Sequence, residues 1–228
     1  MGPLPQEGNV PSTQERVYER LRTMLRDQEI KPDARLNIAE TASSLDASII
    51  PTREAFARLS AEGLLERVPG SGFKVPGLSV ANVEGDFTVV FLFLRHITDL
   101  YFSNEDAAAG ILDQIRLKNN RLPDLFDDPE AISLEAERFV RDLLPFSNSA
   151  KLRSCVEAAL DSSTPYRRVY YRETLDPTQY LAVRLAYEDA LRSGDEAASR
   201  EMVRVSQRDW EGKTRDLCRY AWIELFEN

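Results

Sequence analysis

The sequence predicts a mainly α-helical protein in which three helices and a β-hairpin precede an all-α helical bundle. Apolar residues recur every three or four positions through most of the 228 residues, as they do on the buried face of a helix. One stretch instead reads as paired strands, because the turn residues 69–72 separate two short apolar runs. Beyond residue 77, breaks at Pro, Gly, Ser and Asn leave six or seven amphipathic segments with short connections, a pattern typical of a bundle and not of a sheet.

Residues 12–76 show the order of elements found in a winged helix-turn-helix. Each of the three expected helices starts at a capping residue: Ser12 or Thr13 for the first, Asn37 for the second and Ser48 for the third. Glu40 lies three residues after Asn37, which is the spacing of a capping box, and Gly63 offers the third helix a left-handed end. The runs 64–68 and 73–75 then read as the two strands of the wing.

The C-terminal part, residues 77–228, is expected to be helical throughout. We expect helices over residues 80–102, 105–119, 130–144, 150–161, 165–173, 177–192 and about 195–226. This part contains no internal repeat and no phosphate-binding loop. Residues 1–11 carry neither a helix nor a strand pattern, and we expect them to form a disordered arm.

Charge is distributed unevenly along the chain. The formal net charge of −9 speaks against a nonspecific coat for nucleic acid. Residues 1–76 hold ten Lys or Arg and eleven Asp or Glu, a net charge of −1, whereas the remainder holds nineteen and twenty-seven, a net charge of −8. The N-terminal part can therefore bind DNA only if its arginines gather on one face.

Several other classes of protein are not expected. The longest apolar run, 89–94, is far shorter than the roughly 20 residues that a membrane crossing needs. The N-terminus has no export signal, and the two cysteines, Cys155 and Cys218, are expected to be free thiols, so we expect a cytoplasmic protein. With one histidine, His96, and no nucleophile motif, hydrolysis lacks an evident base, and we expect no enzyme activity.

The stretch 36–75, together with the residues just before it, resembles the GntR family of bacterial transcription regulators, in the branch typified by the fatty-acid regulator FadR. The matching residues are Pro32, Arg35, Leu36, Ala42, Leu45, Ser48, Pro51, Arg53, Glu54, Ala55, Leu59, Glu62, Gly63, Leu64, Gly72 and Val75. The resemblance implies that residues 12–76 bind double-stranded DNA and that residues 77–228 form an effector-binding and dimerisation domain.

The resemblance also implies which residues meet DNA. Arg35 is similar to an arginine that meets phosphate or base edges near the second helix, and Arg53 to one that enters the major groove. Arginine suits this role because its planar fork can bind guanine in bidentate fashion. Ser48 and Thr52 are placed near the leading end of the third helix, where hydroxyls and amides meet phosphate. Gly70 at the wing tip suits close approach of the backbone to the minor groove.

One departure from the family concerns the start of the third helix. The family usually has an arginine where this chain has Ile49, which can offer only apolar contact, for instance to a thymine methyl. The pair Ile49 and Ile50 could instead be a protein contact surface. Arg58 and Arg67 are expected to be solvated salt-bridge partners rather than DNA ligands, and for Lys74 both roles stay open.

The C-terminal part resembles the all-helical effector domain of the FCD type. The segments 139–148 and 190–195 match in register, and the match allows a test for metal. Many such domains hold a divalent ion with one aspartate and three histidines. The corresponding positions here read Ala136, Val140, Arg184 and Ser206. None of the four is a usable ligand for a transition metal, so we expect no metal and no cofactor.

The same register suggests a small organic acid as the effector. Arg184 places a fixed positive charge where a metal would lie, and its guanidinium can pair with a carboxylate while Ser206 contributes a hydroxyl. The cavity walls expected around such a ligand are Phe87, Phe91 and Phe139. The alternative is that Arg184 pairs with Glu188, one turn further along its helix, or with another acidic neighbour, and that side chains fill the cavity.

These observations favour an effector-responsive homodimer that regulates transcription from a palindromic operator. A dimer is expected because one recognition helix reads only a few base pairs. Two alternatives remain open. The chain could be a protein-interaction module with a degenerate DNA surface, or it could be a helical protein that binds small molecules. Salt-dependent DNA binding would separate the first reading from the other two.

Overall fold

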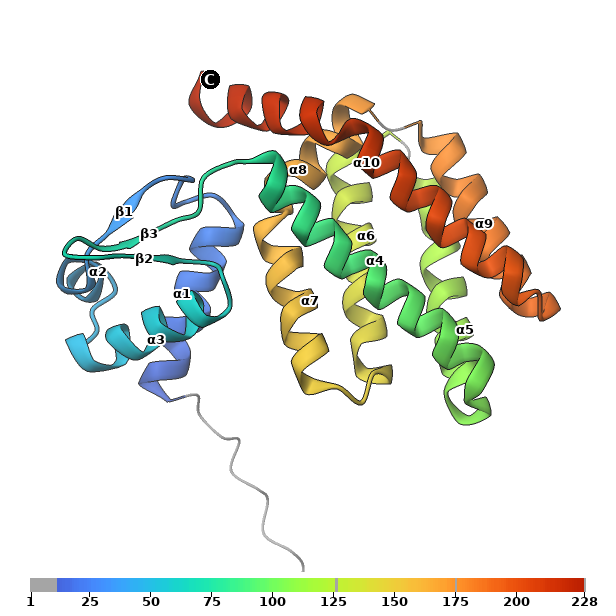
Figure 1. Cartoon of the computed structure of the whole chain (residues 1–228), viewed down its shortest axis with the longest axis horizontal. Coiled ribbons are helices and arrows are strands. Elements are labelled where there is room, and N and C mark those ends of the chain that lie inside the picture. The colour runs from blue at the N-terminus through green and yellow to red at the C-terminus, as the bar shows by residue number, and fades with distance from the viewer. Residues whose placement is uncertain (1–11, 126, 175, 228) are drawn as a thin grey trace, which may run out of the picture. The chain divides into compact units, whose positions relative to one another are not determined.

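The computed structural model describes residues 12–125, 127–174 and 176–227, and the chain divides into two compact units, Met1–Gly77 and Leu78–Asn228 (Figure 1). The arm expected over residues 1–11 lies outside the described residues. The mainly α-helical fold class is confirmed, with a small antiparallel sheet confined to the first unit. None of the described helices combines the length and the apolar character that a membrane crossing requires.

The N-terminal unit contains three helices and three short strands. They are α1 (Thr13–Arg26), β1 (Arg35–Leu36), α2 (Ile38–Ser44), α3 (Ile49–Ala61), β2 (Glu66–Val68) and β3 (Gly72–Lys74). The strand order is β1-β3-β2, and both pairings are antiparallel. The sequence patterns predicted the hairpin but not β1. The first strand of the wing is also shorter than expected, because Leu64 and Leu65 are buried in the core and precede β2.

Side chains from the helices and from the wing fill the core of the N-terminal unit. Ser12 caps α1 by accepting a hydrogen bond from the amide of Glu15, and Asn37 caps α2. Leu21 and Phe56 are fully buried, and the Phe56 ring meets Phe73 of the wing edge to face, with centroids 5.0 Å apart. This contact joins the wing to α3, so the orientation of one fixes that of the other.

The C-terminal unit is built from helices alone. It contains α4 (Val80–Ser103), α5 (Glu105–Asn119), η1 (Leu122–Leu125), α6 (Pro129–Leu143), η2 (Leu144–Phe146), α7 (Ala150–Ser162), α8 (Thr164–Val169), η3 (Tyr170–Thr174), α9 (Pro177–Ser193) and α10 (Glu196–Phe226). The segment expected as a helix over 165–173 changes within its length, since η3 is a π-helical turn, a form that often marks functional sites.

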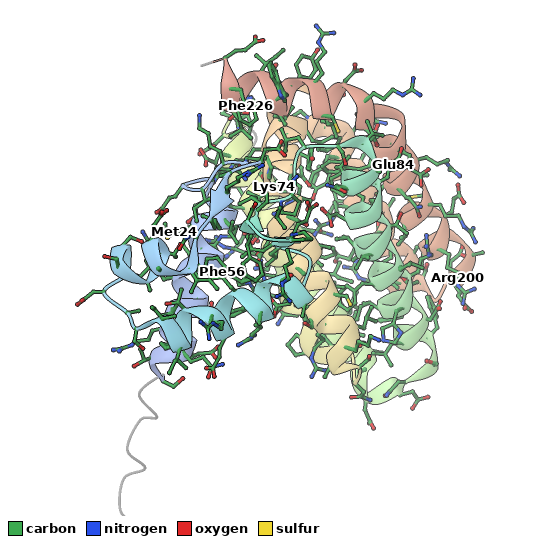
Figure 2. All side chains as sticks on the ribbon, turned by 60° about the vertical axis from the view of Figure 1, so that its left-hand side comes forward. Met24, Phe56, Lys74, Glu84, Arg200 and Phe226 are labelled. Atoms are coloured by element: carbon green, nitrogen blue, oxygen red, sulfur yellow. The ribbon has the colours of Figure 1, made fainter. Side chains whose placement is uncertain are left out.

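Helix α4 is the centre of this unit. Its Val83, Phe93 and Ile97 are fully buried, and the helix packs against α5, α7 and α10. Figure 1 shows α10 running alongside α4 over much of its length. Charged side chains occupy the outer surface, as Figure 2 shows for Arg200 on α10, which pairs with Asp99 and Glu196. The buried stripes of the helices thus meet in one interior, as the apolar spacing predicted.

A first prediction concerns the wing. At Gly72, with φ of +90°, an added Cβ would lie 2.8 Å from the carbonyl oxygen of Leu36, whereas at Gly70, with φ of +74°, nothing lies within 4 Å. Gly72→Ala should lower the free energy of unfolding by about 2–3 kcal/mol, and Gly70→Ala, which introduces backbone strain alone, by about 1 kcal/mol. Urea unfolding of the full chain measures both, and equal losses would show that the close approach to β1 is irrelevant.

A second prediction concerns Asp86 on α4. Burial raises the pKa of this carboxyl to about 7, against the opposing effects of Ser162 and Arg167. The Ser162 hydroxyl donates a hydrogen bond to Asp86 Oδ2 at 2.6 Å. Because the folded-state pKa exceeds the ordinary value of 3.8, the native state holds the proton more tightly. The stabilisation is complete below pH 4 and is lost as the pH rises through 7, by at most about 1.4 kcal/mol per pH unit.

Replacing the carboxyl by an amide should remove this pH dependence. Asp86→Asn should therefore gain stability relative to the wild type as the pH is raised from 5 to 8, measured as the difference in unfolding free energy by urea titration. A difference that stays constant over this range would contradict the assignment.

Candidate nucleic-acid interface and interior cavity

The leading end of α3 presents an unusual apolar surface. Ser48 occupies the N-cap position, but its side chain makes no capping hydrogen bond. The two residues that follow are exposed, Ile49 by 48% and Ile50 by 68%. Because the two side chains are adjacent and the interior of the unit does not use them, they form a candidate contact surface for another molecule.

Thr52 does not share this exposure, and its predicted contact with DNA is wrong. It is fully buried, and its hydroxyl donates to the carbonyl oxygen of Ser48 at 2.9 Å. Thr52 belongs to the inward stripe of α3 together with Ala55, Phe56 and Leu59, spaced by three, one and three residues. The hydroxyl therefore satisfies the first turn of the helix and faces the core.

Arg53, on α3, and Arg35, on β1, are both exposed. In the part of the chain that the structure describes, neither guanidinium forms an ion pair or a hydrogen bond. Arg67, on β2 opposite Phe73, has the same character, although we expected it to pair with a carboxylate. This expectation was wrong, and Arg67 joins the candidate interface. Sequence alone gave no signal for it, since ion pairing depends on which carboxylates the fold brings near.

Other cations of the same unit are neutralised. Arg58 pairs with Glu15 at 3.1 Å and with Glu62 at 3.2 Å, which confirms its expected role as a salt-bridge residue. Its guanidinium also lies 3.5 Å from the centre of the Tyr18 ring. A paired arginine binds phosphate less well, because its carboxylate partner must move away and repels the phosphate until it does.

Two further cations of this unit are also held by carboxylates. Arg20 pairs with Glu29 at 2.8 Å. Lys74, labelled in Figure 2, lies 3.3 Å from carboxylates of both Asp33 and Glu66. The hydrogen bond that its ammonium donates to Glu66 is the largest of several effects that raise its pKa. For Lys74, whose role the sequence left open, the structure therefore favours an ion pair within the sheet.

The wing tip is open to solvent. Gly70 has a φ of +74° and no atoms within 4 Å of a Cβ built on it, so the backbone there is accessible from outside. The amide of Ser71 donates to the carbonyl oxygen of Val68 at 3.0 Å and closes the turn. Gly70 is thus the exposed end of a tight hairpin, the geometry that a backbone needs to approach another molecule closely.

The helical unit contains a cavity of about 90 Å³. The four positions compared above with a metal site, Ala136, Val140, Arg184 and Ser206, all line it. The three aromatic residues proposed as walls, Phe87, Phe91 and Phe139, line it as well. The fold therefore brings together every residue that the sequence proposed for an effector site. Among the described residues, no group of three or more His, Cys, Asp or Glu could hold a metal ion.

Arg184 does not pair with Glu188, so the alternative reading of this arginine is wrong. Glu188 instead pairs with Arg192 and accepts a hydrogen bond from Asn119 Nδ2 at 3.1 Å. Arg184 Nη1 donates to the hydroxyl of Tyr180 at 3.0 Å, and its guanidinium carbon lies 3.6 Å from the centre of the Phe139 ring. The hydroxyl of Ser206 donates its hydrogen to the carbonyl oxygen of Met202 at 3.2 Å. It can therefore only accept a further hydrogen bond.

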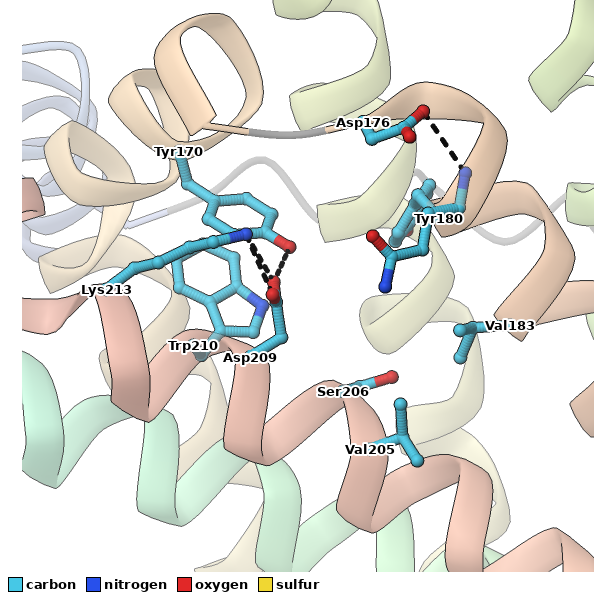
Figure 3. Close-up of a pocket in the computed structure, with 10 residues that line it drawn as sticks. Tyr170, Asp176, Tyr180, Val183, Val205, Ser206, Asp209, Trp210 and Lys213 are labelled. Carbon is cyan, nitrogen blue, oxygen red and sulfur yellow. Dashed lines mark hydrogen bonds and ion pairs between the residues drawn. The ribbon is translucent and has the colours of Figure 1, made fainter.

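A smaller neighbouring cavity of about 50 Å³ is drawn in Figure 3. Tyr170 stacks on Trp210 with ring centres 3.7 Å apart. Asp209 accepts hydrogen bonds from the Tyr170 hydroxyl at 2.5 Å and from Lys213 Nζ at 2.8 Å. The residues that this space shares with the larger cavity are Tyr180, Ser206 and Trp210. Asp209 and Lys213 pair with each other and Asp176 caps α9, so each charged group of this cavity has a partner, unlike the outer edge of Arg184.

Three helices, a short sheet with an open wing tip, and exposed arginines on α3, β1 and β2 define a DNA-binding protein of the winged helix-turn-helix class. Residues 13–75 match the model of the bacterial regulatory proteins of the gntR family. Residues 13–75 thus form a helix-turn-helix domain of the gntR type.

Known proteins similar to the whole chain are of the same kind. An HTH-type transcriptional regulator in an unstable DNA locus of Streptomyces ambofaciens is 28% identical over 193 residues, 84% of this chain and 80% of its own. The structure of E. coli McbR/YncC aligns with a TM-score of 0.64 at 20% identity, covering 96% of this chain and 99% of that one. A GntR transcriptional regulator of Rhodococcus sp. RHA1 aligns with a TM-score of 0.65 at 21% identity, covering 90% and 99%. The two structures support the fold.

Proposed function

We propose that this regulator acts in the cytoplasm as a homodimer that binds a palindromic operator, with α3 in the major groove and the wing at the minor groove. The observation that carries the proposal is that Arg35, Arg53 and Arg67 are exposed and have no carboxylate partner in the described structure. Phosphates and guanine edges are the partners that such guanidinium groups bind best. Ser48, Ile49 and Gly70 complete the surface.

We infer a dimer because the recognition helix α3 is short. Helix α3 has 13 residues, and its leading end can contact only a few base pairs. Two copies related by a twofold axis would read two half-sites separated by a helical turn or a multiple of it. We assign dimerisation and effector binding to residues 77–228, as in the FCD type of domain. A small organic acid in the interior cavity would favour one arrangement of the dimer, because a ligand shifts an equilibrium only by binding one state better.

A second candidate is a protein-interaction module, and the exposure of Ile49 and Ile50 favours it. Aliphatic pairs at such exposure are common at protein interfaces. The two candidates differ in their response to salt, since phosphate contacts release counterions and weaken steeply as salt is raised. Selecting bound sequences from random DNA with the purified full chain would identify an operator, and failure to enrich any sequence would favour the module.

A third prediction tests the base-reading arginine. On the selected operator, Arg53→Ala should weaken binding by about 1–3 kcal/mol and relax specificity at one base pair of each half-site. Arg20→Ala, which removes an exposed arginine already paired with Glu29, is the matched control and should leave affinity within about 0.5 kcal/mol. Titrations by fluorescence anisotropy at fixed salt measure both. Equal effects of the two variants would contradict the assignment of Arg53.

A fourth prediction tests the apolar contact. If Ile49 meets a thymine methyl, replacing that thymine by uracil should weaken binding by the loss of one buried methyl, about 1 kcal/mol. Ile49→Ala should weaken binding to the thymine operator and be nearly insensitive to the uracil replacement. The two changes together form a double-mutant cycle. Additive effects at every thymine of the half-site would show that Ile49 does not read a methyl group.

A further inference from the structure

The side chain of Arg184 has hydrogen-bond donors that the protein does not use. The residue is 8% exposed, and its Nε and Nη2 are buried without a partner among the described residues. These two nitrogens carry the parallel N–H bonds of one edge of the guanidinium, which is the edge that a carboxylate accepts in a bidentate pair. The opposite side is already fixed, since Nη1 donates to Tyr180 and Phe139 stacks on the plane. The guanidinium is therefore held in place, while the donors of its Nε and Nη2 edge have no partner among the described residues.

The positive charge of Arg184 is also uncompensated. The other cation lining the same cavity, Arg167, pairs with Glu137 at 2.5 Å. Although burial alone would raise it, Arg167 and Arg141 hold the pKa of Glu137 below its ordinary value, so this carboxylate stays charged. In the neighbouring cavity, Lys213 pairs with Asp209. Among the described residues that line either cavity, Arg184 is thus the cation without a carboxylate.

A buried guanidinium without a partner is unfavourable, because neither water nor protein replaces its hydration. The other buried cations of this unit show how the chain avoids the penalty. Lys118, for example, lies 2.7 Å from Asp142 and 3.4 Å from Glu135. The exception at Arg184 points to a group that is supplied from outside, with one negative charge and two acceptor atoms.

The remaining walls limit what that group can be attached to. Most of the other lining residues are apolar or aromatic, among them Phe87, Val90, Phe91, Leu94, Leu160 and Trp210. A polyhydroxylated or doubly charged acid would leave polar groups without partners against these walls. The volume of about 90 Å³ is smaller than the roughly 150 Å³ of a dry engineered cavity that binds benzene. The occupant is therefore short, unless it extends into the adjoining cavity past Ser206.

We propose that the cavity binds a small apolar monocarboxylate through Arg184, without a metal ion. The inference rests on the proposed function, since it names the class of effector that the helical unit takes. The carboxylate occupies the Nε and Nη2 edge of the guanidinium, and the hydrocarbon part lies against Phe87, Phe91 and Phe139. A cation at the same place would be repelled by the fixed charge of Arg184, so the site is selective for anions.

Such a ligand would connect four helices of the bundle. Arg184 belongs to α9, Phe139 to α6, Phe91 to α4 and Ser206 to α10. Neutralising the guanidinium between them would strengthen the packing of α9 on its neighbours. The ligand-bound unit is therefore more rigid than the empty one, and rigidity within each copy is a property through which a bound acid can bias a dimer.

The fifth prediction is tested by calorimetry and thermal unfolding of the full chain, treated with EDTA, against butyrate, benzoate and phenylacetate. At least one of these acids should bind and raise the Tm. Its amide, butyramide, benzamide or phenylacetamide, which has the same shape and no charge, should bind at least about tenfold more weakly, as should the dicarboxylate succinate. Equal binding of acid and amide would overturn the proposal, and so would an equal response to inorganic phosphate or a requirement for added metal.

Two variants separate a ligand site from a structural role of the arginine. Arg184→Met keeps much of the volume and removes the charge, so the empty protein should gain in Tm while affinity for the acid falls at least about tenfold. Arg192→Met changes an arginine on the same helix that is exposed and paired, and it should leave acid binding unchanged. A loss of Tm in empty Arg184→Met would show that the guanidinium is structural and overturn the proposal.

The outcome is independent of the DNA-binding proposal. Operator affinity of the empty wild-type protein is measured in parallel. Failure to bind any operator would count against the proposed function, whereas failure to bind any of the three acids would count against the inference about the cavity.

Discussion

The pairing of arginines with carboxylates is the interaction on which this account depends. The N-terminal unit is nearly neutral, and its cations differ in whether a carboxylate holds them. Arg20 and Arg58 are held by glutamates, whereas Arg35, Arg53 and Arg67 have no such partner among the described residues. A domain with little net charge can bind a polyanion only through cations that its own carboxylates leave available. The fold, by placing the glutamates, determines which surface can meet DNA.

The same principle operates in the interior of the helical unit, with a larger energetic effect. Exposed ion pairs contribute little to stability, but a buried guanidinium without a partner is strongly unfavourable. Arg167 and Lys118 satisfy the rule through Glu137 and Glu135. Arg184 does not, although Tyr180 and its neighbours hold its guanidinium in place. An exception that the surrounding structure maintains is typical of a position used for binding.

Local signals in the sequence predicted the helices, because a cap such as Asn37 and an apolar stripe act within a turn or two of their own position. Strand β1 gave no signal, since its two residues pair with β3 only in the folded unit. Thr52 was misassigned from its residue type, although its place three residues before Ala55 already indicated the buried face. Whether a carboxylate reaches Arg67 or Arg184 depends on the arrangement of distant segments, and the sequence pattern does not provide it.

The most direct test of the central claim is the salt dependence of operator binding. The slope of the logarithm of affinity against the logarithm of salt concentration counts the phosphates that the protein neutralises. In a variant with alanine at 35, 53 and 67 the slope should become shallower by about one for each arginine that contacts a phosphate. Arg26 pairs with Asp27 at 3.0 Å, so a matched variant with alanine at the paired positions 20, 26 and 58 should keep the wild-type slope. Equal changes in the two variants would contradict the division of the arginines by their carboxylate partners.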